Sequence, residues 1–110
     1  MRIAQINLPT HDNEGFPLVA ETDMLRHMLL DVFGGFTETS GNGVWRDGSN
    51  GTIYREPVTV FQIACPDTLE SAGHLRSMAG AMAREARQVC VFLVLPSGAV
   101  EFVEPVKLEA

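Results

Sequence analysis

The sequence predicts an α+β domain of the ferredoxin-like βαββαβ plait type, with one additional strand at its C-terminal end. Five segments have the composition and hydrophobic pattern of strands, and two have the apolar repeat of three to four residues that marks a helix. Split βαβ units in this order usually form an antiparallel sheet that two helices cover on one face. A length of 110 residues suits a single domain, 1–110.

The first part of the chain predicts a strand, a polar loop and a helix. Every second residue from 4 to 8 is apolar, which predicts a strand over Arg2–Leu8. Turn-forming residues crowd the segment Pro9–Gly15. Apolar residues then recur at helical spacing over Val19–Phe33, and Gly34 suits the left-handed position that ends a helix.

The middle of the chain predicts a long hairpin with arms Phe36–Trp45 and Thr52–Cys65. The segment Arg46–Gly51 between them contains an Asp-Gly and an Asn-Gly pair, which is a strong turn signal. The motif Gly41-x-Gly43 interrupts the first arm and indicates a β-bulge or a close approach of another backbone. Pro57 has no backbone N–H, so we expect an edge or a bulge at that point of the second arm.

The end of the chain predicts a second helix and two further strands. The helix begins near Asp67 and ends near residue 87. Asp67 with a glutamate three residues later resembles a capping box, and Thr68 is the competing N-cap residue. We expect a buried strand over Val89–Leu95 and an alternating last strand over Ala99–Val103.

Composition and charge exclude several classes of partner. The formal net charge is −6, and Lys107 is the only lysine, so the clustered basic residues that bind nucleic-acid phosphates are absent and we expect no nucleic-acid partner. The longest apolar run, Val89–Leu95, is too short to cross a bilayer, so we expect no membrane partner. The first residues lack the pattern of a secretory signal, which predicts a cytoplasmic protein in which Cys65 and Cys90 are buried and reduced.

Common catalytic and cofactor motifs are absent from the sequence. It contains no Cys-x-x-Cys, Walker loop, Gly-x-Gly-x-x-Gly, His-Glu-x-x-His or Gly-x-Ser-x-Gly pattern, so we assign no catalytic residue and expect no cofactor. The run His11-Asp12-Asn13-Glu14 has side chains that could bind a metal or move protons, but its spacing matches no metal signature and a polar turn explains it. We therefore expect no metal, and we place His27 and His74 on the surface or at the boundary of the apolar stripe of each expected helix.

The candidate ligand-binding residues are Trp45, Arg46, Tyr54, Arg55 and Glu56, all within the predicted hairpin. Aromatic faces, arginine donors and one orienting carboxylate would together form a pocket for a small ligand. The competing interpretation is architectural, because Trp45 and Tyr54 would also form a cross-strand aromatic pair beside solvated charges.

Several of these segments together resemble a family of small uncharacterised proteins that phages, prophages and plasmids encode. The residues that carry the resemblance are the loop Pro9–Gly15, the run Phe33-Gly34-Gly35-Phe36-Thr37, the run Gly41-x-Gly43-x-Trp45-Arg46-Asp47, and Tyr54-x-Glu56 with the Val-rich strand after it. The part from Trp45 to Asp67 is also similar to a bacterial domain of unknown function. The resemblance implies an accessory protein of a mobile element and supplies no catalytic residue.

These observations lead to a main functional hypothesis and two alternatives. The main one is a nonenzymatic accessory binding protein, a homodimer that sequesters or blocks a host protein or a small nucleotide-like ligand. The first alternative is a small plait-fold enzyme that acts on a small molecule by acid/base chemistry through Glu56, His11 or Tyr54. A mimic of nucleic acid is the weakest, because the acidic residues are spread along the whole chain.

Overall fold

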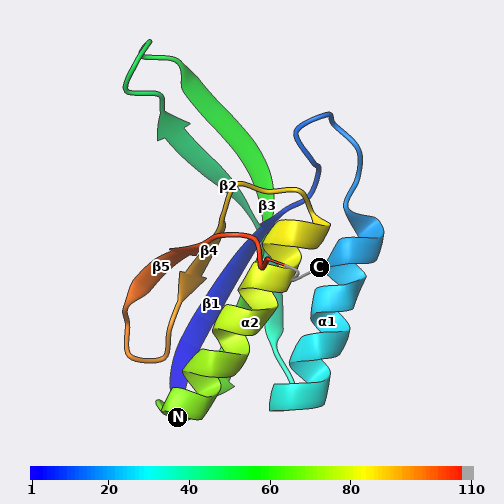
Figure 1. The fold of residues 1–110 in the computed structure, drawn as a ribbon, viewed down its shortest axis with the longest axis vertical. Helices are drawn as coiled ribbons and strands as arrows, with labels where there is room; N and C mark the ends of the chain where they lie inside the picture. Colours follow the sequence, from blue (N-terminus) through cyan, green and yellow to red (C-terminus); the bar gives the residue numbers. More distant parts are fainter. Residues whose placement is uncertain (108–110) are drawn as a thin grey trace.

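The computed structural model describes residues 1–107 and contains every predicted element (Figure 1). In chain order the elements are β1 (Arg2–Pro9), α1 (Val19–Phe33), β2 (Thr37–Arg46), β3 (Ile53–Cys65), α2 (Leu69–Glu85), β4 (Val91–Val94) and β5 (Val100–Val103). The largest differences in bounds are at α2, which is two residues shorter at each end than expected, and at β4, where the expected strand Val89–Leu95 keeps only its middle.

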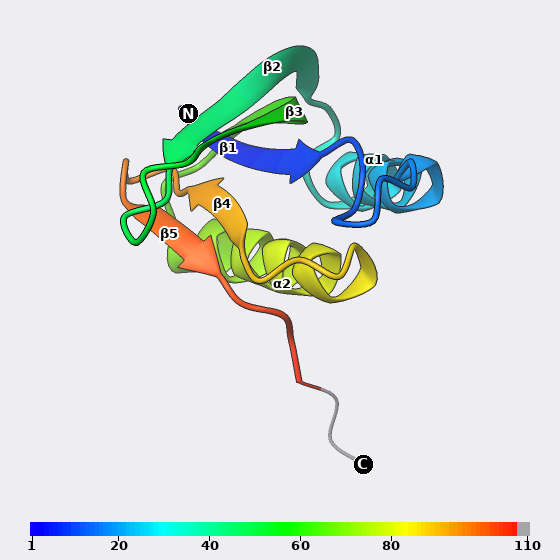
Figure 2. The same ribbon diagram turned by 90° about the horizontal axis from the view of Figure 1, so that it is seen from above.

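The strands form one antiparallel sheet in the order β2-β3-β1-β4-β5. Both helices lie on the same side of this sheet (Figure 2), so the other face has no helix over it. The structure is thus a plait-like α+β fold, which confirms the predicted class. The extra C-terminal strand is β5, and it extends the sheet beside β4.

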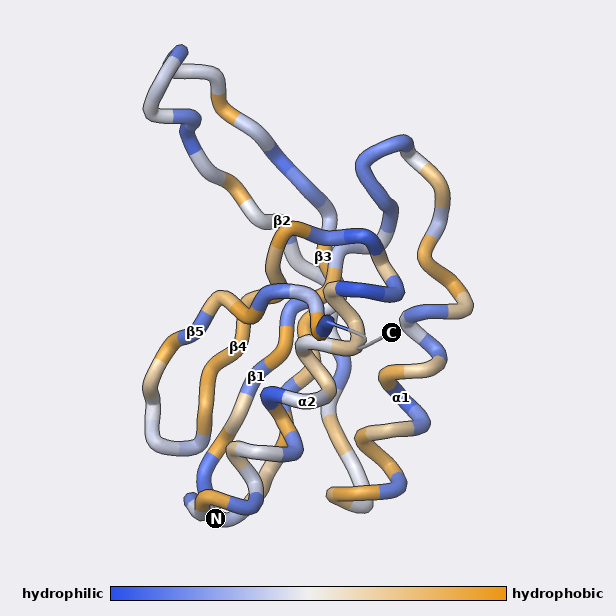
Figure 3. The backbone as a smooth tube through the Cα atoms, in the orientation of Figure 1, coloured by the Kyte–Doolittle hydropathy of each residue, from blue (hydrophilic) through white to orange (hydrophobic). Residues whose placement is uncertain are grey.

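The core lies between the helices and the helix-covered face of the sheet. On β1 the even-numbered residues Ala4, Ile6 and Leu8 are fully buried, and on β3 Phe61 and Ile63 are fully buried opposite them. Figure 3 shows apolar and polar residues alternating along both helices, and β4 almost wholly apolar. Because successive side chains of a strand point to opposite faces, the odd-numbered residues of β1 lie on the open face.

Local sequence signals explain where the helices begin and end. Gly34 follows α1 with a left-handed φ of 82° and donates its N–H to the Leu30 carbonyl, as predicted. The N-cap of α2 is Thr68, whose side chain accepts a hydrogen bond from Ser71 N. The favoured capping box at Asp67 is therefore wrong, and the competing residue caps the helix.

The β2–β3 hairpin extends beyond the rest of the sheet as a two-stranded ribbon (Figure 1). The pairing of β3 with β1 ends at Val58, which lies opposite Pro9. Pro57 therefore lies beyond the last β1–β3 pair, where its lack of an N–H removes no hydrogen bond to β1. The register of β2 on β3 is continuous, so the glycine motif makes no bulge. A Cβ at Gly41 would lie 3.4 Å from a Val60 methyl group, which is a side-chain contact at ordinary distance, so the expected close approach of a backbone is not found at this position either.

The two cysteines differ in their surroundings. Cys65 on β3 is fully buried, as expected, whereas Cys90, just before β4, is only half-buried and so differs from the expectation. Both thiols are free. Within residues 1–107, neither helix is long and apolar enough to cross a membrane.

Candidate functional site

A cavity of about 770 Å³ lies on the open face of the sheet, between the β2–β3 ribbon and the β4–β5 edge. This volume falls within the range of small-molecule sites. The residues that line it are Asn7, Pro9, Asn13, Gly43, Val44, Trp45, Glu56, Val58, Gln88, Val89, Cys90, Phe92 and Phe102. The site therefore draws on all five strands, the loop after β1 and the segment between α2 and β4.

The twist of the sheet brings these distant segments together. Figure 2 shows the ribbon turning toward the side on which β4 and β5 lie. Asn7 on β1 is opposite Val60 on β3 and Phe92 on β4, so its side chain lies near the middle of the open face. Gly43 lies opposite Glu56 in the ribbon, and both residues line the cavity.

Among residues 1–107, Glu56 is the only charged residue that lines the cavity. Its side chain is half-buried, and this burial raises the pKa of the Glu56 carboxyl above its ordinary value. Neither arginine of the hairpin lines the cavity. A single partly desolvated carboxylate among neutral groups favours a ligand with a positive charge.

Aromatic rings form two walls of the cavity. Trp45 stacks on Tyr54 across the ribbon, with ring centroids 5.5 Å apart and planes 20° apart. Phe92 and Phe102 pair edge to face on β4 and β5, with centroids 5.8 Å apart. Phe102 is 66% exposed and Trp45 48% exposed, so each still has a ring surface that a ligand can cover.

The structure separates the five predicted site residues. Trp45 and Glu56 line the cavity, and Tyr54 supports Trp45 from behind. Arg46 and Arg55 alternate with these residues along the two strands, so their side chains leave from the other face of the ribbon. Trp45 thus satisfies both interpretations, because it is a cross-strand partner and a cavity wall at once. The ligand-binding roles of all five residues stay predictions.

Sequence reasoning missed the residues that come from outside the hairpin. The most informative of these are Asn7, Gln88, Cys90, Phe92 and Phe102. Gln88 and Cys90 share the segment between α2 and β4, the other three lie on three different strands, and none belongs to a motif. The alternation along β1 and β5 marks Asn7 and Phe102 as open-face residues, but this becomes useful only once the strand order is known.

The acidic loop after β1 is held by its own hydrogen bonds. Asp12 Oδ1 accepts from the backbone N–H groups of Glu14 and Phe16, both at 2.9 Å. His11 Nδ1 lies 2.8 Å from the Thr10 hydroxyl oxygen. This is the polar turn that the sequence predicts, and its Asn13 reaches the edge of the cavity.

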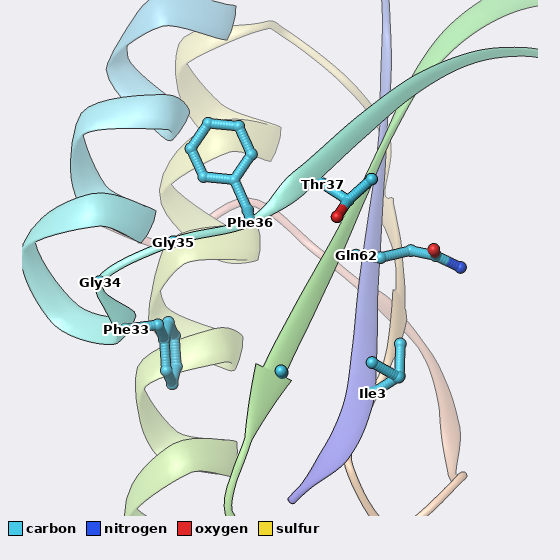
Figure 4. A pocket seen from close by; sticks show the side chains of 8 residues that line it. Ile3, Phe33, Gly34, Gly35, Phe36, Thr37 and Gln62 are labelled. Carbon is cyan, nitrogen blue, oxygen red and sulfur yellow. The ribbon is translucent and has the colours of Figure 1, made fainter.

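A second cavity, of about 400 Å³, lies where the loop after α1 enters β2 (Figure 4). Phe33 and Phe36 lie on the helix side of it, whereas Ile3 and Gln62 project from the sheet on the side away from α1. Its lining contains no charged side chain. It offers little for orienting a charged ligand, so the larger cavity is the candidate site.

Replacement of Glu56 with glutamine is expected to stabilise the fold at neutral pH. A carboxyl whose pKa is raised by folding favours the folded state when protonated, so its contribution falls as pH rises from the unfolded-state pKa, about 4.3 for glutamate, through the folded-state pKa. The urea midpoint of Glu56→Gln should exceed that of the parent at about pH 7 and approach it at about pH 4. Glu104→Gln, at an exposed position just after β5, is the control. An equal difference in urea midpoint at both pH values would contradict the raised pKa of the Glu56 carboxyl.

Comparisons with known proteins identify the fold and no family. No model of a known protein family matches the sequence, and no curated protein matches it. Two solved structures match in three dimensions, both of a phage SAM lyase: one in complex with S-methyl-5′-thioadenosine, with a TM-score of 0.68, and one in the apo state, with a TM-score of 0.69. Each is 13% identical to this chain and covers 97% of it, and this chain covers 92% and 91% of theirs.

These comparisons correct the main functional hypothesis and agree with the resemblance to a phage-borne family. Both structures that share this fold over nearly their whole length are of an enzyme. The expectation of a nonenzymatic accessory binding protein is therefore wrong, and the alternative of a small-molecule enzyme is favoured. Both structures come from phage, in agreement with the phage-borne family that the motifs resemble. At 13% identity the likeness shows the fold alone.

Proposed function

We propose that this chain is an enzyme that cleaves SAM or a closely related sulfonium nucleoside in the open-face cavity. The observation that carries the proposal is the lining of that cavity: exposed aromatic rings on two walls, with Glu56 as the single charged group. The fold shared with a phage SAM lyase supplies the reaction class. The proposal keeps the small-molecule enzyme of the sequence-based alternative and gives Glu56 a role in binding the substrate in place of the acid/base role expected for it.

The chemistry of the ligand matches the lining of the cavity. SAM carries an adenine ring, a positively charged sulfonium and an amino-acid end with its own ammonium and carboxylate. A purine ring gains from stacking on an aromatic side chain, and Trp45 offers a half-exposed indole already fixed by Tyr54. Burial of the Glu56 carboxylate costs solvation free energy, and the Coulomb attraction of a nearby cation offsets that cost.

A lyase that releases S-methyl-5′-thioadenosine from SAM must break the bond between sulfur and the γ-carbon of the methionine part. The electron pair of that bond stays on sulfur, and the four-carbon fragment either gives up a proton or closes onto its own carboxylate. Sulfur thereby loses its positive charge in the transition state. A fixed carboxylate beside sulfur would stabilise the substrate more than the transition state, so Glu56 serves the reaction best on the ammonium group, which keeps its charge.

The direct test is incubation of the purified protein with SAM and detection of S-methyl-5′-thioadenosine by liquid chromatography and mass spectrometry. We expect protein-dependent release of the nucleoside that Trp45→Ala reduces and Glu104→Gln leaves unchanged. Circular dichroism confirms that each variant is folded. SAM that stays intact beside folded parent protein would sink the proposal.

Other sequence-based expectations stay predictions beside this proposal. They are the homodimer, the ferredoxin-like form of the plait, the host partner protein and the cytoplasmic location. The open face leaves Ile3 and Val100 more than half exposed outside the cavity lining, which is the surface that a second copy would cover. The mass of the purified protein in solution, measured across a range of concentrations, decides whether a homodimer forms.

A further inference from the structure

A chain of side-chain amides crosses the open face and ends at the candidate site. Gln5 and Asn7 lie two residues apart on β1 and so share one face, and Gln62 on β3 is directly opposite Gln5. Gln62 Nε2 donates to Gln5 Oε1 at 3.4 Å, and Gln5 Nε2 donates to Asn7 Oδ1 at 3.0 Å. Figure 4 shows the Gln62 side chain reaching away from the helices, on the side where this chain runs.

The direction of these hydrogen bonds fixes what Asn7 offers to the cavity. A carboxamide has one acceptor oxygen and one NH2 donor, and the Asn7 oxygen already accepts from Gln5. The residues opposite Asn7 on the two neighbouring strands are Val60 and Phe92, whose side chains accept no hydrogen bond. Within residues 1–107, Asn7 Nδ2 makes no hydrogen bond, although the side chain is half-buried and lines the cavity. The oxygen of Asn7 is thus turned toward Gln5, and its NH2 group is the part of the amide whose hydrogen bonds are left for a ligand.

The free NH2 group of Asn7 selects the part of the ligand that this side chain binds best. An asparagine that reads the adenine edge presents its oxygen and its nitrogen to the base together, whereas the Asn7 oxygen is directed toward Gln5 on the same strand. A carboxylate has acceptor oxygens only, so it matches an NH2 group that can only donate. The Glu56 carboxylate, which is the charged group of the described lining, is suited to the ammonium group.

We propose that Asn7 binds the substrate's carboxylate, and that Gln5 and Gln62 are positioning residues that hold its NH2 group toward the cavity. The inference rests on the proposed function, because it takes the ligand to be a nucleoside with an α-amino-acid end. With Glu56 on the ammonium, the site recognises both charges of that end while the aromatic wall holds the nucleoside.

Two variants replace the NH2 group that residue 7 offers to the cavity by an oxygen. One of them leaves the residues that line the cavity unchanged. Asn7→Asp replaces the donor by a carboxylate that repels the substrate's own. Gln5→Glu leaves only acceptor oxygens at position 5, so Asn7 must turn its NH2 toward Glu and its oxygen toward the cavity. Ile3→Glu adds the same charge to the same face of β1, two residues from Gln5, and controls for charge alone.

The experiment measures Kd by calorimetry for S-adenosylhomocysteine, which has the amino-acid end, and for S-methyl-5′-thioadenosine, which lacks it. Asn7→Asp and Gln5→Glu should weaken S-adenosylhomocysteine by about 10-fold to 100-fold, the loss of a hydrogen bond to a charged group, and leave S-methyl-5′-thioadenosine unchanged. Ile3→Glu should change neither by as much. Equal effects on both ligands, no effect, or no binding of S-adenosylhomocysteine by the parent protein would overturn the inference.

The same data separate this inference from the proposed function. Both ligands are uncleaved probes, so the selective loss can be observed even where SAM is not turned over. Conversely, the parent protein could cleave SAM while both variants keep its affinity for S-adenosylhomocysteine. That result would support the proposed function and reject the role of Asn7. The Asn7 side-chain NH2 resonances, followed by NMR, should move on addition of S-adenosylhomocysteine and stay in place with S-methyl-5′-thioadenosine.

Discussion

Truncation of Phe61 to alanine is expected to lower the free energy of unfolding by about 3–5 kcal/mol. Phe61 is fully buried in the middle of β3, with Ile6 opposite it on β1 and Phe36 edge to face at 5.6 Å between ring centroids. Its removal leaves a cavity between the sheet and both helices that the neighbouring rings cannot fill. The loss is a large share of the about 5–15 kcal/mol that holds a domain of this size together.

Urea unfolding followed by circular dichroism measures this loss, with Phe16→Ala as the matched control. Phe16 is 63% exposed in the loop before α1, so the same truncation there should change stability by less than about 0.5 kcal/mol. Phe61→Leu should fall between the two, because it keeps most of the buried volume. A loss below about 1 kcal/mol for Phe61→Ala would mean that the core does not lie where β3 places it.

Truncation of Trp45 to alanine is expected to weaken binding of SAM, S-adenosylhomocysteine and S-methyl-5′-thioadenosine alike, by about 10-fold to 100-fold. The reason is that stacking of a base on an aromatic side chain is worth about 1–3 kcal/mol and all three ligands share the base. Trp45→Phe keeps an aromatic face and should retain most of the affinity. Trp45 lies in the two-stranded ribbon outside the core, so the variant should stay folded.

The matched variant Glu56→Gln should give a different pattern across the same ligands. It removes a charged hydrogen bond to the ammonium group, so SAM and S-adenosylhomocysteine should lose about 10-fold to 100-fold in affinity while S-methyl-5′-thioadenosine does not. Calorimetry supplies Kd for the two uncleaved ligands, and KM reports on SAM. If Trp45→Ala unfolds the protein, or if Glu56→Gln affects all ligands equally, these residues are architecture and the pocket interpretation fails.

Local signals in the sequence were sufficient for most of the fold. The left-handed glycine after α1, the Asp-Gly and Asn-Gly turn and the apolar repeats act over a few residues, and they place the elements within one or two residues. Errors arose where two local signals competed. Asp67 and Thr68 are both good N-caps, and only the path of the chain into α2 decides that Thr68 Oγ1 reaches Ser71 N.

The site was only half predictable, because its walls come from strands far apart in the chain. The hairpin composition identified Trp45 and Glu56, but the opposite wall at Phe92 and Phe102 depends on the strand order and on sheet twist. The absence of a catalytic motif led to the wrong expectation of a nonenzymatic protein. Single residues that meet across a sheet leave no spacing signature, so that absence carries no weight in a fold of this kind.

The central claim is that a sulfonium nucleoside binds on the open face of the sheet, and a crystal structure with S-methyl-5′-thioadenosine tests it most directly. We expect the adenine ring against the exposed face of Trp45, with the thioether side directed toward Glu56 and Asn7. The ligand bound on the helix-covered side, in the smaller cavity beside Phe36, or at no defined position in the crystal would contradict this account.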